Sequence, residues 1–377
     1  MASNPFHYGT PVEGDQFTGR QQELSALVSR MANGINVVLL APRRHGKTSL
    51  LLRAAAELAR SNPAPAIVRA NVLRARDLAA LAGQLTTAVY QLRGGRWHRS
   101  RQALPEFLRR LRVRPTVTVN DHGRPVFAFE AGLAGPDADT VLADVYGLLA
   151  EQAASRPAVL ILDEFQAIVD HGAHLPNLFK ALAEKHPAVC LVMAGSKRHL
   201  MERLVSAEGA PLYDMAQKLA LGPIPEHVMA RFLCNRAVAG GKLMTEPTAG
   251  LTVGLAGPVP NDIQRLAYEA FEVADQMIDD GAVNAGLAQA VAHETATYAE
   301  MFASRAPGQR RVLAALAAGI SHPLFSAAFA KSVGLAGANS VKKAIDSLDA
   351  DELIANRDGR WQVADPFLAA WLRLDPT

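Results

Sequence analysis

The sequence predicts an α/β fold, in which a parallel sheet carries helices on both faces and is followed by a helical region and a C-terminal winged helix. Two patterns in the chain of 377 residues lead to this prediction. Apolar runs of four to eight residues alternate with helical patterns through about the first 200 residues, as in parallel sheets with covering helices. Helical patterns then take over, and a short hairpin follows near the C-terminus.

The apolar runs are expected to form the strands of the sheet, because a strand buried on both faces reads as a continuous apolar run. The expected strands cover residues 35–40, 66–72, 158–162 and 189–194. The helix before the third strand shows its apolar face in the spacing of Val141, Val145 and Leu148, and Asp137 or Asp139 can cap its start.

The first expected strand runs into the sequence APRRHGKTS at residues 41–49. This matches the phosphate-loop pattern G-x-x-x-x-G-K-[ST], in which backbone N–H groups and a helix N-terminus surround phosphates, the lysine neutralises them and the hydroxyl binds Mg²⁺. Ala41 replaces the first glycine, where a small residue suffices if its φ is negative. A helix over residues 48–60 should follow, and the alternative is a basic turn before a helix. The predicted nucleotide-binding residues of the loop are Pro42, Arg43, Arg44, His45, Gly46, Lys47, Thr48 and Ser49.

The third expected strand leads into two carboxylates, Asp163 and Glu164. If this strand lies beside the loop strand, Asp163 reaches the carboxyl edge of the sheet, where it can hold Mg²⁺ together with Thr48. Glu164 can polarise an attacking water as a general base. The alternative is an exposed acidic strand end. The presence of a phosphate loop favours ATP and Mg²⁺ as ligands and hydrolysis of ATP as the activity.

The fourth expected strand is followed by Ser196, Lys197 and Arg198 at the same edge of the sheet. A hydroxyl or a cation in this place can detect the γ-phosphate and stabilise charge during its transfer. We therefore predict Lys47, Glu164, Ser196 and Arg198 as catalytic residues. The alternative for the last strand end is a solvated basic turn.

Residues 93–130 interrupt the alternation of strands and helices between the second and third strands. Residues that favour strands flank a turn at 120–125, so a β-hairpin over 116–129 is expected as an insertion outside the sheet. The eight arginines that precede it, against a single acid, are Arg93, Arg96, Arg99, Arg101, Arg109, Arg110, Arg112 and Arg114. This 93–114 segment, with Trp97 and Phe107 for stacking, is a candidate for binding DNA or RNA. The alternative is a solvated amphipathic helix.

Three domains are expected along the chain. They are a P-loop core over residues 1–222, which contains the insertion, a helical lid over 223–305 and a winged-helix domain over 306–377. The lid helices are expected at 225–239, 260–274 and 285–303. In the last domain, a helix over 339–349 precedes a hairpin whose turn is at 357–360.

The outer face of the helix over 339–349 carries Lys342 and Lys343 but also Asp346 and Asp349. Phosphate contacts provide most of the nonspecific affinity for DNA, and a balanced face provides few of them. A protein partner is therefore at least as compatible with the winged helix as DNA is.

Several blocks of the chain resemble, in order, the archaeal-type ATPases of the AAA+/STAND group of P-loop proteins. They are FTGRQQEL at 17–24, PRRHGKTSL at 42–50, VLILDEFQ at 159–166, GSKRHLM at 195–201, LGPI at 221–224, AGPVPNDIQRL at 256–266 and VADPFLAAWLR at 363–373. The resemblance implies that the first block, with Gly19 and Arg20, helps to enclose the adenine end of the nucleotide. It also implies that Pro260 of the lid lies near the base. Read alone, Pro260 is an ordinary first residue of a helix.

The motifs and the resemblance together predict an ATP-binding and ATP-hydrolysing switch that acts on a protein partner. Two alternatives stay open: a nucleic-acid-associated ATPase of the initiator or transposition-helper type, and a nonhydrolysing nucleotide sensor. Assembly into a homo-oligomer, with an arginine supplied by a neighbouring subunit, is compatible with the first prediction.

The composition predicts a cytoplasmic protein. Cys190 and Cys234 are the two cysteines, and they form no disulfide framework, which fits a reducing compartment. No apolar run approaches the roughly 18 residues of a membrane span. The start MASNPFHYG lacks the basic and apolar regions of a secretory signal. The net charge of +3 is small, so the local arginine cluster is more informative than the sum.

Overall fold

The computed structural model describes residues 3–92, 103–130, 135–205, 209–320, 323–357 and 359–374. The chain divides into two compact units, which we call the sheet unit (Pro11–Gly222) and the helical unit (Met1–Thr10 with Pro223–Thr377). Part of the predicted arginine cluster lies outside the described residues, namely Arg93, Arg96, Trp97, Arg99 and Arg101.

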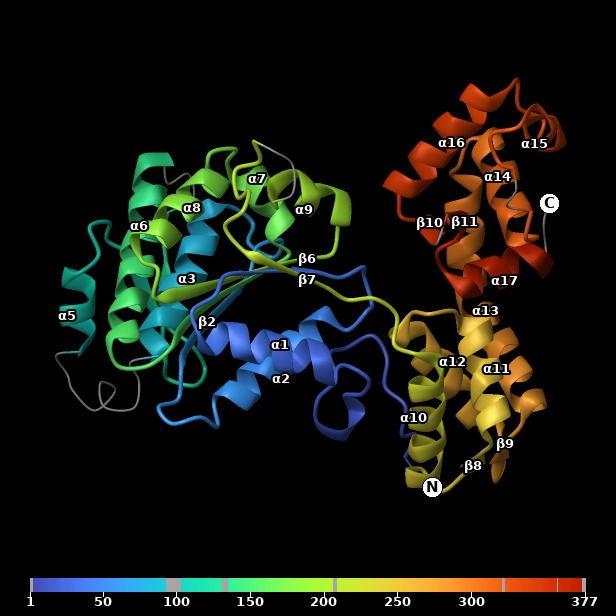
Figure 1. The fold of residues 1–377 in the computed structure, drawn as a ribbon, viewed down its shortest axis with the longest axis horizontal. Helices are drawn as coiled ribbons and strands as arrows, with labels where there is room; N and C mark the ends of the chain where they lie inside the picture. Colours follow the sequence, from blue (N-terminus) through green and yellow to red (C-terminus); the bar gives the residue numbers. More distant parts are fainter. Residues whose placement is uncertain are drawn as a thin grey trace. The chain divides into compact units, whose positions relative to one another are not determined.

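Five parallel strands form the central sheet of the sheet unit, in the order β2-β5-β6-β1-β7 (Figure 1). They are β1 (Val37–Leu40), β2 (Ala66–Asn71), β5 (Ala158–Asp163), β6 (Val189–Gly195) and β7 (Gln217–Ala220). The four strands expected from apolar runs are confirmed. The edge strand β7 was not predicted, because most of its residues are exposed and it carries no apolar run.

The strand order corrects one expectation, because β5 does not lie beside β1. Strand β6 lies between them, pairing Gly195 with Leu40 on one side and Ala194 with Asp163 on the other. Helical crossovers allow parallel strands to pair out of their sequence order. The carboxyl ends of β1, β6 and β5 nevertheless meet at one edge of the sheet.

Alternate residues of each strand enter different cores on the two faces of the sheet. Val37 and Leu39 pack in one core with α1 (Gln21–Ala32) and α2 (Lys47–Leu58). Val38 belongs to the other core, which α3 (Leu78–Leu92), α6 (Gly135–Ala150), α8 (Leu175–Lys185) and α9 (Arg198–Val205) help to build. Helices therefore cover both faces, as predicted (Figure 1). Burial of each large apolar side chain contributes roughly 1.5–3 kcal/mol.

Helix α6 begins earlier than the sequence suggested. It starts at Gly135, so Asp137 lies in its first turn and neither Asp137 nor Asp139 is its N-cap. The carboxylate of Asp139 instead lies 2.9 Å from Nε2 of His174, just before α8. Short elements complete the sheet unit: η1 (Gly14–Gln16), η2 (Glu151–Ala154), η3 (Phe165–Ala167) and α7 (Ile168–His171).

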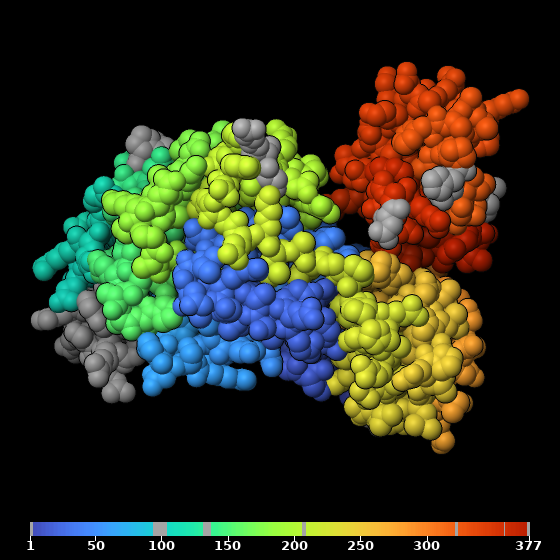
Figure 2. Space-filling view, viewed as in Figure 1, coloured from blue at the N-terminus to red at the C-terminus, as the bar shows by residue number. Residues whose placement is uncertain are grey.

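The predicted insertion is confirmed as a separate two-stranded hairpin of β3 (Thr116–Val119) and β4 (Pro125–Ala128). It follows α5 (Ala103–Arg109), and both lie on the surface of the sheet unit (Figure 2). Phe107 does not offer a stacking surface, which corrects our expectation. It is fully buried against Tyr90 and Phe127, with ring centroids 5.0 and 5.3 Å away.

The helical unit begins with the region that is expected to form the lid, which contains α10 (Glu226–Ala239), α11 (Glu246–Ala256), α12 (Pro260–Val273) and α13 (Asp280–Ala303). A small parallel pair, β8 (Leu243–Met244) and β9 (Met277–Ile278), links them. Helix α13 starts five residues before the expected position, because Asp279 caps it by accepting a hydrogen bond from the N–H of Ala282 (2.8 Å). Helices α12 and α13 cross closely at Gly286, where an added Cβ would lie 2.6 Å from the backbone N of Ala270.

The winged helix is confirmed at the C-terminus. It comprises α14 (Pro307–Ala317), α15 (Ala327–Ser332), α16 (Ala338–Ala350), β10 (Ile354–Arg357), β11 (Arg360–Val363) and α17 (Pro366–Leu374). Its core is continuous with that of the lid: Trp371 of α17 packs on Tyr298 and Phe302 of α13, with centroids 6.2 and 5.7 Å away. The lid and the winged helix thus share one hydrophobic core. Among the described residues, no helix is both long and apolar enough to cross a bilayer.

Candidate nucleotide-binding site

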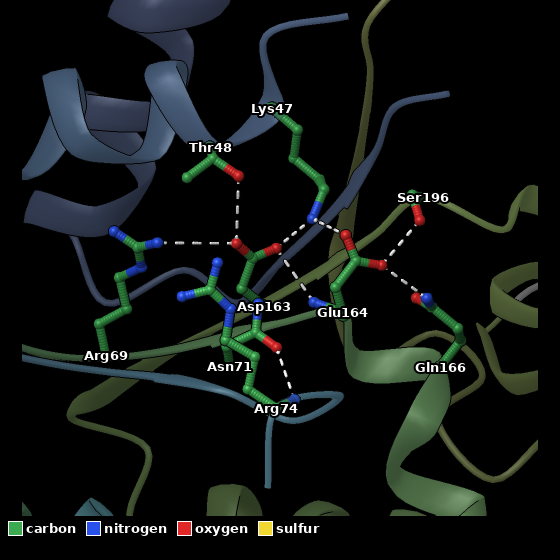
Figure 3. Close-up of polar contacts among 9 residues, drawn as sticks. All are labelled: Lys47, Thr48, Arg69, Asn71, Arg74, Asp163, Glu164, Gln166 and Ser196. Carbon is green, nitrogen blue, oxygen red and sulfur yellow. Dashed lines mark hydrogen bonds and ion pairs between the residues drawn. The ribbon is translucent and has the colours of Figure 1, made fainter. Parts of the chain in front are cut away.

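The candidate site is built where three neighbouring strands end. Strand β1 runs into the loop before α2, β5 ends at Asp163 and β6 ends at Gly195. Since β6 lies between β1 and β5, Ser196 emerges between the loop and the two carboxylates Asp163 and Glu164. This convergence brings together the side chains shown in Figure 3.

The loop accommodates alanine at its first position. The left-handed residues of the loop are Arg44 (φ +64°) and Gly46 (φ +84°), and Ala41 is not among them. Ala41 is buried, and its N–H donates to the carbonyl of Gly195 (3.2 Å). Gly46 is the N-cap of α2, and its carbonyl accepts from the N–H of Leu50 (2.9 Å). Of the two glycine positions in the pattern, only the second has a left-handed φ here, so Gly46 is the glycine that the backbone needs.

Lys47 makes ion pairs with both carboxylates. Its Nζ contacts Oδ1 of Asp163 and lies 2.8 Å from Oε1 of Glu164 (Figure 3). Thr48 donates through Oγ1 to Oδ2 of Asp163 (3.3 Å). Because Asp163 is only 1% exposed, the cation of Lys47 compensates a buried charge.

Glu164 is held at both carboxylate oxygens. Oε1 binds Lys47, while Oε2 accepts from Nε2 of Gln166 (2.6 Å) and from Oγ of Ser196 (2.7 Å). Its backbone is left-handed (φ +54°), a conformation that a non-glycine residue adopts at some cost. Burial alone would raise the pKa of Glu164, but the hydrogen bonds from Lys47, Gln166 and Ser196 and the charge of Lys47 lower the pKa below its ordinary value. The carboxylate is therefore ionised at neutral pH.

Two residues of this cluster were not identified from the sequence. Arg69 of β2 places its guanidinium 3.8 Å from Oδ2 of Asp163, and Gln166 binds Glu164. A cation inside the apolar run of β2 was the available signal for Arg69. For Gln166 the signal was a polar residue two positions after Glu164.

The N-terminal segment of the sheet unit is bonded to the loop and to the helix that follows it. Arg20 is 4% exposed and donates to the carbonyls of His45 (3.4 Å) and Gly222 (2.6 Å) as well as to Glu23 (2.9 Å). The N–H of Val12 donates to Oγ of Ser49 in α2 (3.0 Å). The preceding residue of the F-x-G-R element, Gly19, has a left-handed φ of +69°. A role of Gly19 and Arg20 at the adenine stays a prediction.

Two predicted site residues do not join the cluster. Arg198 is largely exposed (78% of its side chain) and pairs with Glu202 of α9 at 2.7 Å. Pro260 is the first residue of α12 and belongs to the helical unit. The structure thus brings together Lys47, Thr48, Asp163, Glu164 and Ser196, whose chemical roles stay predictions.

Sequence comparison with protein families matches residues 296–374 to a model described as a probable winged helix domain. This range contains α14 to α17 and the end of α13. No curated protein matches the chain.

Solved structures with similar folds include a Walker-type ATPase and two ORC proteins. The Walker-type ATPase PABY2304 of Pyrococcus abyssi is 17% identical, with a TM-score of 0.67, over 98% of this chain and 99% of that chain. The ORC1 protein of Aeropyrum pernix, in complex with DNA, is 15% identical with a TM-score of 0.53, over 96% and 94% of the two chains. The ORC2 protein of the same organism, in its ADP form, is 12% identical with a TM-score of 0.54, over 99% and 98%. At these identities the likeness establishes a shared fold: a parallel-sheet P-loop ATPase fold with a C-terminal winged helix.

We expect Lys47 and Asp163 to be energetically coupled in the absence of nucleotide. Lys47→Met leaves the buried Asp163 without its nearest cation, so it should destabilise the protein by about 1–3 kcal/mol. In an Asp163→Asn background the same change should cost much less. Urea unfolding of the four proteins at neutral pH measures this difference. Equal costs in both backgrounds would contradict a compensating ion pair.

We also expect Arg20 to order the phosphate loop. Arg20→Met removes the donors to the carbonyls of His45 and Gly222, so backbone amides of residues 43–46 should exchange with solvent faster, by roughly tenfold for a loss of about 1.4 kcal/mol. Glu23→Gln is the matched control, since it leaves both carbonyl bonds in place. Hydrogen exchange without nucleotide measures the effect, and exchange rates equal to wild type in Arg20→Met would refute it.

Proposed function

We propose that this chain binds Mg-ATP and hydrolyses it, and that it works as an ATP-dependent switch. The observation that carries the proposal is the convergence of Lys47, Thr48, Asp163, Glu164 and Ser196 at the ends of three neighbouring strands. A loop alone would support nucleotide binding. A carboxylate ionised at neutral pH beside it supports hydrolysis as well.

The donor set fits the ligands that we propose. Lys47 is the loop cation for the β and γ phosphates, and the N-terminus of α2 offers its backbone N–H groups to them. Thr48 and Asp163 supply a hydroxyl and a carboxylate that contact each other, and oxygen ligands of this kind suit Mg²⁺. When bound, Mg²⁺ would neutralise charge that develops on the phosphates.

Side chains of this protein would carry out the remaining catalytic roles. Glu164 would accept a proton from the attacking water, and Ser196 would detect the γ-phosphate through its hydroxyl. Arg198 would have to leave Glu202 to act as a catalytic cation. We favour a cation supplied by a neighbouring copy or by a partner, which is compatible with self-association.

A protein partner is the proposed receiver of the signal. The lid and the winged helix share one core, so we expect the winged helix to move together with the lid. On the outer face of α16, Lys342 pairs with Asp346 at 3.4 Å, which leaves little net charge for nucleic acid.

We propose that Pro260, at the start of α12, and the Gly19–Arg20 element face the base of the nucleotide.

Glu164→Gln tests the proposal directly. The change preserves shape but removes the base, so ATP should still bind while turnover falls by roughly 10² to 10⁴. Lys47→Ala is the comparison variant, which should lose ATP binding itself. Steady-state phosphate release and calorimetric titration with ATP separate the two effects. Unchanged turnover in Glu164→Gln would assign the base to another residue, and a wild-type protein that binds ATP without turnover would be a nucleotide sensor.

A nucleic-acid-associated ATPase is the second candidate. Two observations favour it: the fold is shared with an origin-recognition protein solved with DNA, and the insertion exposes arginines. Arg110 contacts Glu151 and Arg112 binds Asp144 (2.7 Å), so acids of the same unit already neutralise these two. Arg109 and Arg114 are exposed and make no ion pair within the described part of the chain.

This difference between the arginines gives a test. The double variant Arg109→Ser, Arg114→Ser should weaken retention of duplex DNA and lower the slope of log affinity against log salt by about 2, because each lost phosphate contact removes about 0.9. The pair Arg110→Ser, Arg112→Ser is the matched control and should change the slope less. Fluorescence anisotropy across a salt series measures both. Absence of DNA binding by wild type at low salt would eliminate this candidate.

A further inference from the structure

Gln166 is a buried polar residue whose side chain is hydrogen-bonded to Glu164. It lies in η3, two residues after Glu164, and is only 4% exposed. The left-handed backbone of Glu164 starts η3, and the carboxamide of Gln166 donates to Oε2 of Glu164 at 2.6 Å. Figure 3 shows this contact beside that of Ser196.

The chemistry of the contact fixes the orientation of the Gln166 carboxamide. An ionised carboxylate can only accept hydrogen bonds, so the NH₂ group of Gln166 must face Glu164. Oε1 then points the other way, where it is buried and has no hydrogen-bond partner among the described residues. Leaving that oxygen unpaired has a cost, which indicates that the bond to Glu164 decides the orientation.

Gly195 makes room for this arrangement. A Cβ added at Gly195 would lie 2.6 Å from Oε1 of Gln166 and would also meet the side chain of Met201. Gly195 is the last residue of β6, directly before Ser196. The last residue of β6, which precedes Ser196, therefore also leaves space for the carboxamide of Gln166.

The two oxygens of Glu164 are held by different kinds of partner. Oε2 accepts from Gln166 and Ser196, which come from η3 and from the end of β6. Oε1 binds Lys47, the residue that the proposed function assigns to the phosphates. If Lys47 turns to the phosphates and the Ser196 hydroxyl to the γ-phosphate, Oε1 loses its partner while Oε2 keeps its donor Gln166.

We propose that Gln166 is a positioning residue for hydrolysis, which anchors Oε2 of Glu164 and leaves Oε1 to accept a proton from the attacking water. In that step the water oxygen bonds to the γ-phosphorus, and the bond to the β–γ bridging oxygen breaks with its electrons remaining on ADP. The released proton moves to Oε1. The inference rests on the proposed ATPase function, because Gln166 acts only through Glu164.

Gln166→Met tests the inference, since methionine keeps the length and approximate volume of the side chain but cannot donate. We expect kcat to fall by about tenfold, as for the loss of one hydrogen bond to a charged group, with the KM for ATP within about twofold of wild type. In a Glu164→Gln background, Gln166→Met should cause no further fall. The matched control is Gln152→Met in η2, where the carboxamide accepts from Arg156 at 3.0 Å.

Gly195→Ala provides a second route to the same result without altering Gln166. The added methyl group should displace the carboxamide and lower kcat similarly. Thermal unfolding and binding of a nonhydrolysable ATP analogue verify that each variant is folded.

The outcomes separate the inference from the proposed function. Unchanged or raised kcat in Gln166→Met, or an equal fall in the wild-type and Glu164→Gln backgrounds, would overturn the positioning role while leaving the ATPase intact. A loss that lies in KM alone would overturn it too. Absence of turnover in wild type would refute the proposed hydrolysis, and the positioning role would fall with it.

Discussion

The ion pairs of Lys47 with Asp163 and Glu164 are the constraint around which the site of the sheet unit is arranged. Asp163 is almost completely buried, and a buried carboxylate without a cation is strongly unfavourable. To compensate the charge of Asp163, the start of α2, which carries Lys47, has to lie close to the end of β5. The parallel sheet meets this requirement, because β6 aligns the ends of β1 and β5 on its two sides.

The sequence predicted those parts of the fold that local patterns determine. Four strands are continuous apolar runs because both of their faces are buried, and the hairpin at 116–129 has a turn in which Asn120 accepts from the N–H of Arg124 (3.0 Å). Strand β7 was missed because an exposed edge strand needs no apolar run. The position of β6 between β1 and β5 was missed because helical crossovers permit several strand orders. Local pattern therefore identifies strands better than it orders them.

In the site, too, local sequence predicts some residues, while others depend on the tertiary structure. Gly46, Lys47 and Thr48 are recognisable because backbone geometry and phosphate chemistry demand those residue types in sequence. Arg69 and Gln166 act on Asp163 and Glu164 through contacts that depend on strand order and on the left-handed turn at Glu164. Arg198 illustrates the converse, since its sequence position beside Ser196 does not fix its direction: it begins α9 and pairs with Glu202 four residues later. A residue type at a strand end is thus predictable, whereas the direction of its side chain is a property of the tertiary structure.

The proposed switch needs a path from the loop to the helical unit, and we propose the covalent connections of the chain as that path. The chain passes between the units twice, after Thr10 and after Gly222. Val12, just past the first passage, bonds to Ser49 in α2, and Gly222, at the second, shares Arg20 with the loop carbonyl of His45. On the other side of the first passage, the N–H of Gly9 donates to Asn261 in the first turn of α12 (2.8 Å). Buried or partly buried hydrogen bonds therefore link the phosphate loop and α2 to the chain at both passages.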